Sequence, residues 1–320
     1  MNLNKIIKEL EKKYGEGTLL YLDENRKTDI DIIPTGSVSL DDALGIGGIP
    51  IGRITEIYGA ESSGKTTLAL TILAQAQKKE LKCAFIDAEH SLDTGYAQNL
   101  GVQLSSLLLS QPNSGEQALD ITENLVKTNE IGLIIIDSVA ALTPEAEIEG
   151  TMGQMHIGLQ ARLMSQALRK LTAIASNNKT TIIFINQTRE AIGIKWGSPV
   201  VTPGGKALKF YTSVRIEIKI SAKLLKGTDV IGRRTIVKVV KNKVAAPFKT
   251  TEFDIIFNKG ICHEKDLLNF AHKKKVIQKK GNTYYFEKEK LGGGLERSKK
   301  YLQQNPKILE KIVKKIQKKE

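Results

Sequence analysis

A glycine-rich octapeptide is the first feature of the sequence with chemical content. Residues 59–66, GAESSGKT, match the spacing G-x-x-x-x-G-K-[ST] between a strand pattern at 54–58 and a helix pattern at 66–79. Such a loop turns successive backbone N–H groups toward phosphates, while its lysine and the following hydroxyl serve the terminal phosphates and Mg²⁺. We therefore expect a nucleoside triphosphate site built by Gly59, Glu61, Ser62, Ser63, Gly64, Lys65, Thr66 and Thr67.

Two carboxylates lie at the ends of apolar runs that are typical of buried strands. Asp137 ends the run 133–137, and Glu89 closely follows the run 83–87. Open α/β sheets bind ligands at the carboxyl ends of their strands. We expect Asp137 to support Mg²⁺ and Glu89 to act as the general base on the attacking water. Asp137 alone could equally be an ordinary strand end.

An amide and a basic loop follow the next apolar run, 181–186. Gln187 can hydrogen-bond the γ-phosphate and report its loss, or it can simply cap a loop. Residues 188–206 are rich in glycine, proline and cations and carry the only tryptophan, which suits a single-stranded nucleic acid held by phosphate neutralisation and base stacking. The candidate nucleic-acid-binding residues here are Arg189, Lys195, Trp196, Gly204 and Gly205.

A second glycine-containing loop, residues 149–158, follows the strand that ends at Asp137. It contains Met152, and the helix pattern after it places Arg162 and Arg169 on one face. We expect the arginines to contact the phosphates of a nucleic acid, with Met152 as a further candidate, although a solvated helix face would also explain the arginines. Lys241 and Lys243 alternate on one side of a late strand, where a solvated sheet edge is the simpler interpretation.

The elements that must position these groups form an α/β pattern. Short apolar runs alternate with helices such as 66–79 and 159–176, which predicts a mostly parallel sheet covered on both faces. Runs at 214–220, 235–242 and 251–257 follow each other without a helix and predict an antiparallel extension.

The two ends of the chain differ from this core. Residues 4–14 have the spacing of an amphipathic helix, which needs a partner for its apolar face. Residues 263–320 hold 17 Lys and Arg against seven Asp and Glu, so they carry +10 of the total charge of +13. We predict an oligomerisation helix and linker at 1–26, an ATPase core at 27–262, and a small basic α+β domain at 263–320.

Composition narrows the functional classes. A net charge of +13 favours an anionic partner such as a nucleic acid. Two cysteines are too few for a disulfide framework or a four-cysteine zinc site. A charged N-terminus and the lack of a long apolar run indicate a cytoplasmic protein without a membrane span.

Taken together, the motifs resemble the RecA family of P-loop recombinases. The strings that carry this resemblance are GAESSGKTT, CAFIDAEH, IIIDSVAALTP, EAEIEG, FINQTR, GGKALKFYTSVR and KVVKNKVAAPF. The resemblance implies a helical filament of identical subunits on single-stranded DNA, with ATP and Mg²⁺ bound between neighbours. It also implies pairing with duplex DNA and strand exchange, in recombinational repair of DNA damage.

The same resemblance implies further residue roles. Lys65, Glu89 and Gln187 are the catalytic set, and Asp93 and Tyr96 contact adenine. Lys241 and Lys243 reach the ATP of the neighbouring subunit, and the loops 149–158 and 188–206 are the two DNA-binding loops. A self-cleaving repressor of the SOS response is an implied partner.

Two departures from the family pattern and two alternative functions bear on this interpretation. The chain ends in a lysine-rich segment where many relatives carry an acidic tail, and Lys195 and Trp196 leave the details of base contact open.

An ATP-gated structural filament on DNA is one alternative function, and Glu89 argues against it. A P-loop helicase or small-molecule kinase is another, disfavoured by the RecA-like strings and the two loops.

Overall fold

A computed structural model describes residues 3–15, 18–19, 30–151, 154, 156, 158–190 and 200–317. The chain divides into two compact units, Met1–Asp31 and Ile32–Glu320. The first unit contains helix α1 (Leu3–Tyr14), which confirms the helix expected from the apolar spacing. None of the residues of α1 is buried.

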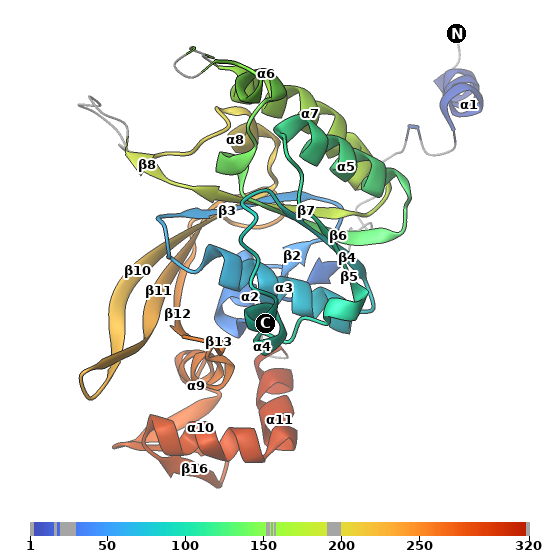
Figure 1. The fold of residues 1–320 in the computed structure, drawn as a ribbon. Coiled ribbons are helices and arrows are strands. Elements are labelled where there is room, and N and C mark those ends of the chain that lie inside the picture. Colours follow the sequence, from blue (N-terminus) through green and yellow to red (C-terminus); the bar gives the residue numbers. More distant parts are fainter. Residues whose placement is uncertain are drawn as a thin grey trace. The chain divides into compact units, whose positions relative to one another are not determined.

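A nine-stranded sheet forms the centre of the second unit, in the order β13-β12-β11-β10-β3-β7-β6-β4-β5 (Figure 1). The pairings from β10 through β3, β7, β6 and β4 to β5 are parallel, and those from β10 to β13 are antiparallel. The predicted parallel sheet with an antiparallel extension is therefore confirmed. The strands are β3 (Ile54–Gly59), β4 (Lys82–Asp87), β5 (Leu107–Ser110), β6 (Ile131–Asp137), β7 (Thr181–Gln187), β10 (Val214–Lys226), β11 (Asp229–Asn242), β12 (Thr250–Ile256) and β13 (Gly260–Ile261).

Helices cover both faces of this sheet (Figure 1). On one face lie α2 (Val38–Leu44), α3 (Lys65–Lys78) and α4 (Thr94–Asn99), and on the other α5 (Gly115–Lys127), α6 (Glu145–Ile148), α7 (Leu159–Asn177) and α8 (Ala207–Tyr211). Side chains of one strand alternate between two apolar cores: Leu133 and Ile135 of β6 pack with α3, whereas Ile134 and Ile136 pack with α5 and α7. The strands are almost continuously apolar in sequence because both of their faces are buried.

Short elements connect these layers. Two-stranded sheets join β1 (Ile32–Ile33) to β2 (Ile49–Pro50), and β8 (Arg189–Glu190) to β9 (Val200–Val201). Single 3₁₀ turns lie at Leu104–Ser106 and Val139–Ala141. The pairing of β8 with β9 holds the start and the end of the 188–206 loop side by side.

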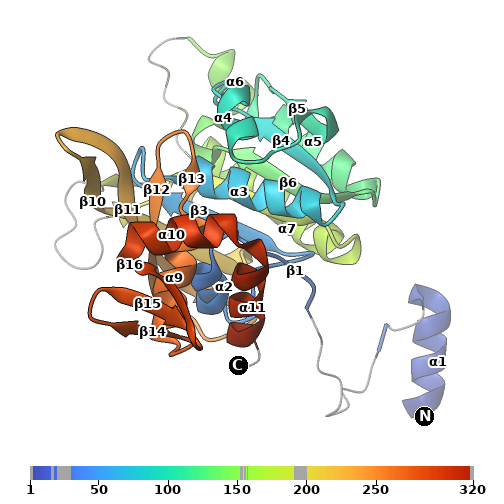
Figure 2. The same cartoon turned by 90° about the horizontal axis from the view of Figure 1, so that it is seen from below.

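The C-terminal segment forms a small α+β module with its own apolar core (Figure 2). Its core residues include Leu268, Leu302 and Ile312. An antiparallel three-stranded sheet lies between its helices, which confirms the expected α+β composition. Its elements are α9 (His263–Lys273), β14 (Ile277–Lys280), β15 (Thr283–Phe286), β16 (Glu289–Gly293), α10 (Leu295–Gln304) and α11 (Pro306–Gln317).

Buried polar groups join α9 to α2 at the border of this module. Asp266 accepts hydrogen bonds from the Ser37 hydroxyl at 2.7 Å and the Ser39 backbone N–H at 3.3 Å. Nearby, Asp41 accepts from the Thr35 N–H at 2.8 Å. Burial is the main reason that the pKa of Asp41 rises to about 7, and the charge of Asp266 adds to this rise. The junction therefore contains a carboxyl group that stays protonated in mildly acidic solution.

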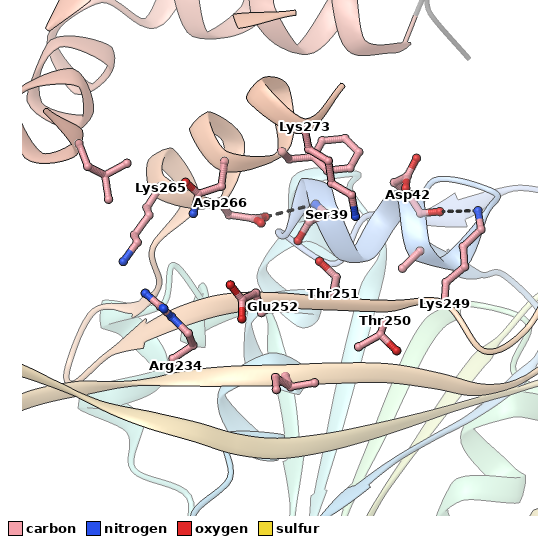
Figure 3. Close-up of a pocket in the computed structure, with 15 residues that line it drawn as sticks. Ser39, Asp42, Arg234, Lys249, Thr250, Thr251, Glu252, Lys265, Asp266 and Lys273 are labelled. Atoms are coloured by element: carbon pink, nitrogen blue, oxygen red, sulfur yellow. Dashed lines mark hydrogen bonds between the residues drawn. The ribbon is translucent and has the colours of Figure 1, made fainter. Parts of the chain in front are cut away.

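A cavity of about 760 Å³ lies at the same junction, between α2, α9, β11 and β12 (Figure 3). Many of its charged lining groups have partners in the protein. Lys249 donates to the Asp42 carbonyl at 3.3 Å, and Arg234 and Lys265 both pair with Asp254. This cavity is larger than the one beside the glycine-rich loop. It lies away from the strand ends where the sequence predicts the chemistry.

We predict that Asp41→Asn makes the stability of this chain less dependent on pH. The folded-state pKa of Asp41 lies above its ordinary value of 3.8, so between about pH 4 and 7 the folded chain binds more protons than the unfolded chain. The free energy of unfolding therefore falls as pH rises through this window. Urea denaturation at pH 5 and pH 7 measures this loss, which should be smaller in Asp41→Asn.

Asp229→Asn is the matched control, because Asp229 is exposed at the start of β11. It should lose the same stability between the two pH values as the unmodified chain. An equal loss in Asp41→Asn would show that Asp41 is not the group that titrates.

Candidate nucleotide-binding site

The glycine-rich loop leads from β3 into α3 and has the backbone that its motif requires. A side chain at Gly59 would place its Cβ 2.2 Å from the Ile218 carbonyl oxygen, so only glycine fits beside β10. Gly64 has a φ of 101°, in the left-handed region that favours glycine, and it begins α3. The backbone N–H groups at the start of α3 thus face the position where the motif predicts phosphates.

Lys65 is buried at the first turn of α3, with a relative exposure of 8%. Its ammonium donates to the Ala60 carbonyl at 2.8 Å, within the same loop. Burial lowers its pKa, against the opposing charges of Asp137, Glu89 and Glu61. A cation that is partly desolvated among carboxylates is well suited to bind a phosphate chain.

Thr66 and Asp137 meet where α3 begins and β6 ends. The Thr66 hydroxyl donates to the Asp137 carboxylate at 2.8 Å, so two hard oxygen ligands of the type that Mg²⁺ prefers lie together. Burial is the main cause that raises the pKa of Asp137 to about 6, and the charges of Glu89 and Asp87 add to it. A divalent cation would relieve this crowding of carboxylates.

An unsatisfied hydroxyl in the same loop supports the fit to a nucleotide. Ser63 Oγ is fully buried, and no hydrogen-bond partner for it exists among the described residues. A phosphate oxygen would supply the missing partner. When bound, Mg²⁺ would be held by Thr66 and Asp137 and would stabilise negative charge on the phosphates.

Glu89 and Gln187 lie together although 98 positions separate them in the sequence. The Gln187 amide donates to Glu89 Oε1 at 3.1 Å, and the Ser138 hydroxyl donates to the same oxygen. Ser138 is a site residue that the sequence interpretation missed. The available signal was its position directly after Asp137 at the end of β6. The carboxylate is thus oriented by two donors, one of which begins the basic loop.

The two expected adenine contacts lie near the start of α3 and α4. The Tyr96 hydroxyl is 2.8 Å from Thr67 Oγ1, and Tyr96 lines a cavity of about 240 Å³ together with residues 62–67. Asp93 caps α4 by accepting from the Tyr96 backbone N–H at 2.9 Å. The structure therefore joins Tyr96 to the glycine-rich loop directly and Asp93 only through Tyr96.

Lys241 and Lys243 bind the end of α8 rather than the glycine-rich loop of their own chain. Lys241 Nζ donates to the carbonyls of Lys209 and Phe210 at 2.6 and 3.0 Å, and Lys243 Nζ donates to that of Phe210 at 3.3 Å. Burial lowers the pKa of Lys241 to about 8, and the charge of Lys243 contributes. They cap the C-terminal carbonyls of a helix, as cations commonly do.

The described candidates for DNA contact lie on α7 and at the two ends of the basic loop. Arg162 and Arg169 are exposed on α7, and Arg189 is exposed on β8. Gly204 and Gly205 both have positive φ, 83° and 74°, as the sharp turn before α8 requires. Three further candidates, Met152, Lys195 and Trp196, lie outside the described residues.

A buried polar network fixes the base of the basic loop to β3. Asn186 Nδ2 donates to Glu56 Oε1 at 3.0 Å and to the Pro203 carbonyl at 3.1 Å, and Arg215 pairs with the other oxygen of Glu56. Glu56 is fully buried. Both ends of the loop are therefore tied to the strand that carries the glycine-rich motif.

A P-loop after β3, a carboxylate at the end of β6 two strands away, and a second carboxylate after the adjacent β4 form the arrangement expected of a P-loop ATPase. A family model for the RecA N-terminal domain matches residues 1–262, and one for the RecA C-terminal domain matches residues 265–320. The chain belongs to the RecA family.

Individual relatives agree with these matches over nearly the whole chain. "Protein RecA" of Bacillus subtilis is 52% identical over 307 residues, which cover 96% of this chain and 88% of that protein. "Protein RecA" of Saccharopolyspora erythraea is 53% identical over 317 residues, covering 99% and 92%. Family membership supports ATP and DNA as ligands and a role in recombination and repair.

We predict that Glu89→Gln separates nucleotide binding from turnover. Glutamine retains the size of the side chain and can still accept from Ser138, but it cannot take a proton from water. Hydrolysis should fall by about a hundredfold or more, while nucleotide affinity changes by no more than a few-fold. Steady-state phosphate release and equilibrium nucleotide titration measure the two quantities.

Glu123→Gln is the control, since Glu123 lies on α5, where it pairs with Lys127 of the same helix and with Lys170 of α7. It should leave turnover unchanged. Near-normal hydrolysis by Glu89→Gln would mean that a different group activates the water.

Proposed function

We propose that this chain is a DNA-dependent ATPase that assembles into filaments on single-stranded DNA and catalyses homologous pairing and strand exchange. Lys65 and the P-loop bind the triphosphate, Thr66 and Asp137 hold Mg²⁺, and Glu89 is the base that activates water. Gln187 links the state of the γ-phosphate to the loop that follows it. Asp93 and Tyr96 contact the adenine base of the nucleotide.

The single observation that carries this proposal is the shared oxygen of Glu89. Gln187, the residue directly before the basic loop, donates a hydrogen bond to Glu89 Oε1. Ser138, which directly follows the proposed metal ligand Asp137, donates to the same oxygen. A γ-phosphate that draws the Gln187 amide away from Glu89 would change the start of the loop. Nucleotide state and DNA contact would then be coupled through one hydrogen bond.

The proposed DNA surface combines the loops at 149–158 and 188–206 with the arginines of α7. Its exposed cations at Arg162, Arg169 and Arg189 suit phosphate contacts, and Trp196 suits base stacking. Lys241 and Lys243 would leave α8 and reach the ATP of an adjacent subunit in the filament. Helix α1, with no buried residue, would supply another subunit contact.

Two further parts of the proposed function follow from the family. Cleavage of a self-cleaving repressor, as part of an SOS response, stays a prediction based on the family. No helix in the described ranges is long and apolar enough to cross a bilayer. We propose a cytoplasmic location, in keeping with a role on DNA.

We predict that single-stranded DNA stimulates ATP hydrolysis by this chain and that duplex DNA does so less. Single strands can engage both the basic loop and its tryptophan, whereas stacked bases in a duplex cannot. Phosphate release is measured without DNA, with single strands and with duplex, at fixed salt. Equal hydrolysis in all three conditions would contradict the recombinase proposal.

The alternative of a purely structural filament makes a different prediction for the same assay. A filament that uses ATP only to set subunit geometry would assemble on DNA with negligible turnover in the unmodified chain. The oriented Glu89 favours the enzyme, because a scaffold has no use for a positioned base.

We further predict that the C-terminal module gathers duplex DNA through phosphates alone. Lys279 and Lys280 are exposed at the end of β14, and Lys288 is exposed in the turn between β15 and β16. The triple substitution of Lys279, Lys280 and Lys288 by Gln should weaken duplex binding. It should also reduce the dependence of log affinity on log salt by up to about three, since fewer counterions are released.

The matched control removes the same number of charges elsewhere, by changing Lys78, Lys82 and Lys127 of the core to Gln. These side chains are also exposed, but they should not alter the salt dependence. Identical slopes in the two triple variants would show that the module's lysines serve only solubility.

A further inference from the structure

Arg233 reaches the P-loop from a strand that is far from it in the sequence. It lies on β11, and its guanidinium Nη1 donates to the backbone carbonyl of Ser62 within the loop. Arg233 also lines the cavity of about 240 Å³ that residues 62–67 and Tyr96 form. A cation outside the P-loop motif therefore stands at the wall of the nucleotide cavity.

An aromatic ring fixes the same guanidinium from a second side. Its Cζ lies 5.3 Å from the ring centroid of Phe257, directly after β12. Phe257 and Ile255 line the cavity as well. Arginine stacks well on aromatic rings because its guanidinium is planar and weakly hydrated. The side chain is thus held in place before any ligand arrives.

The neighbouring arginine shows that this placement is specific. Arg234 points to the opposite face of β11, where its Nε lies 3.1 Å from Asp254 Oδ1. For Arg233, in contrast, no ion pair with a carboxylate occurs among the residues that the structure describes. No described carboxylate therefore neutralises the positive charge beside the cavity.

A guanidinium has five N–H donors, and the Ser62 carbonyl uses one of them. The remaining donors can bind phosphate oxygens, for which the planar fork of arginine is well suited. Lys65 serves the phosphates from inside the P-loop. We infer that Arg233 is a second phosphate-binding cation of the nucleotide site, supplied by β11. This inference rests on the proposed ATPase function and adds a residue to its nucleotide site.

The experiment compares Arg233→Gln with the unmodified chain in equilibrium titrations with ADP and adenosine. Loss of a charged hydrogen-bond donor to phosphate should weaken ADP binding by about tenfold or more. Adenosine affinity should change by less than twofold because adenosine has no phosphate. The affinity for ADP should also become less dependent on salt, by about one charge.

Three results would overturn the inference. ADP affinity within twofold of normal would remove Arg233 from the site, and an equal loss for adenosine would assign it to the base. A loss of ADP affinity with an unchanged salt dependence would make Arg233 a brace for Ser62 rather than a phosphate ligand.

Matched variants complete the design. Arg234→Gln removes the same charge one residue away and should leave ADP affinity within twofold of normal. Arg233→Lys keeps the charge without the planar fork and should give an intermediate ADP affinity.

Lys65→Ala distinguishes a failure of the proposed ATPase site from a failure of the role of Arg233. If it binds ADP normally, the proposed ATPase site fails. If it loses ADP while Arg233→Gln does not, only the role of Arg233 fails.

Discussion

Parallel pairing of β3, β7, β6 and β4 is the constraint on which the whole site depends. Gly59 pairs with Gln187 and Asp87 pairs with Asp137, and the register of β6 with β7 offsets these two pairs by only two residues, so the four strands end at the same edge of the sheet. Because side chains alternate along a strand, a slip of one residue would turn these groups to opposite faces of the sheet. The two apolar cores resist such a slip, since it would exchange every buried side chain between them. Packing far from the phosphates therefore keeps Glu89 within reach of Gln187.

A second constraint connects the nucleotide side of the sheet to the basic loop. Glu56 lies on β3, three residues before the P-loop glycine, and it is fully buried. It is paired with Arg215 and hydrogen-bonded to Asn186, which in turn holds the Pro203 carbonyl. A buried charge left without its partner is costly, so these groups keep their arrangement. The loop between Gln187 and Gly204 thus begins and ends at fixed points.

Much of the fold could be predicted from the sequence because its strands have strong apolar patterns and the P-loop has fixed spacing. Glu89, Asp137 and Gln187 are predictable as polar residues at strand ends, and the structure brings them together, because Glu89 bonds to the Asp137 carbonyl through its backbone N–H and to Gln187 through its side chain. The contacts of Ser138, Arg233 and Lys241 were not predictable, because each depends on an element distant in the sequence. The strands β14 and β16 lacked a sequence signal for a different reason. They are short and rich in lysine and glycine, so they show no regular alternation.

The protonated carboxyl group between α2 and α9 has a calorimetric consequence. Near pH 6 the folded chain holds a proton on Asp41 that the unfolded chain releases, since burial raises the pKa of this group to about 7. Unfolding therefore transfers protons to the buffer. The heat absorbed in a scanning experiment includes the buffer's enthalpy of protonation, so the apparent enthalpy differs between phosphate and an amine buffer. The intrinsic enthalpy is the value extrapolated to a buffer with no heat of ionisation.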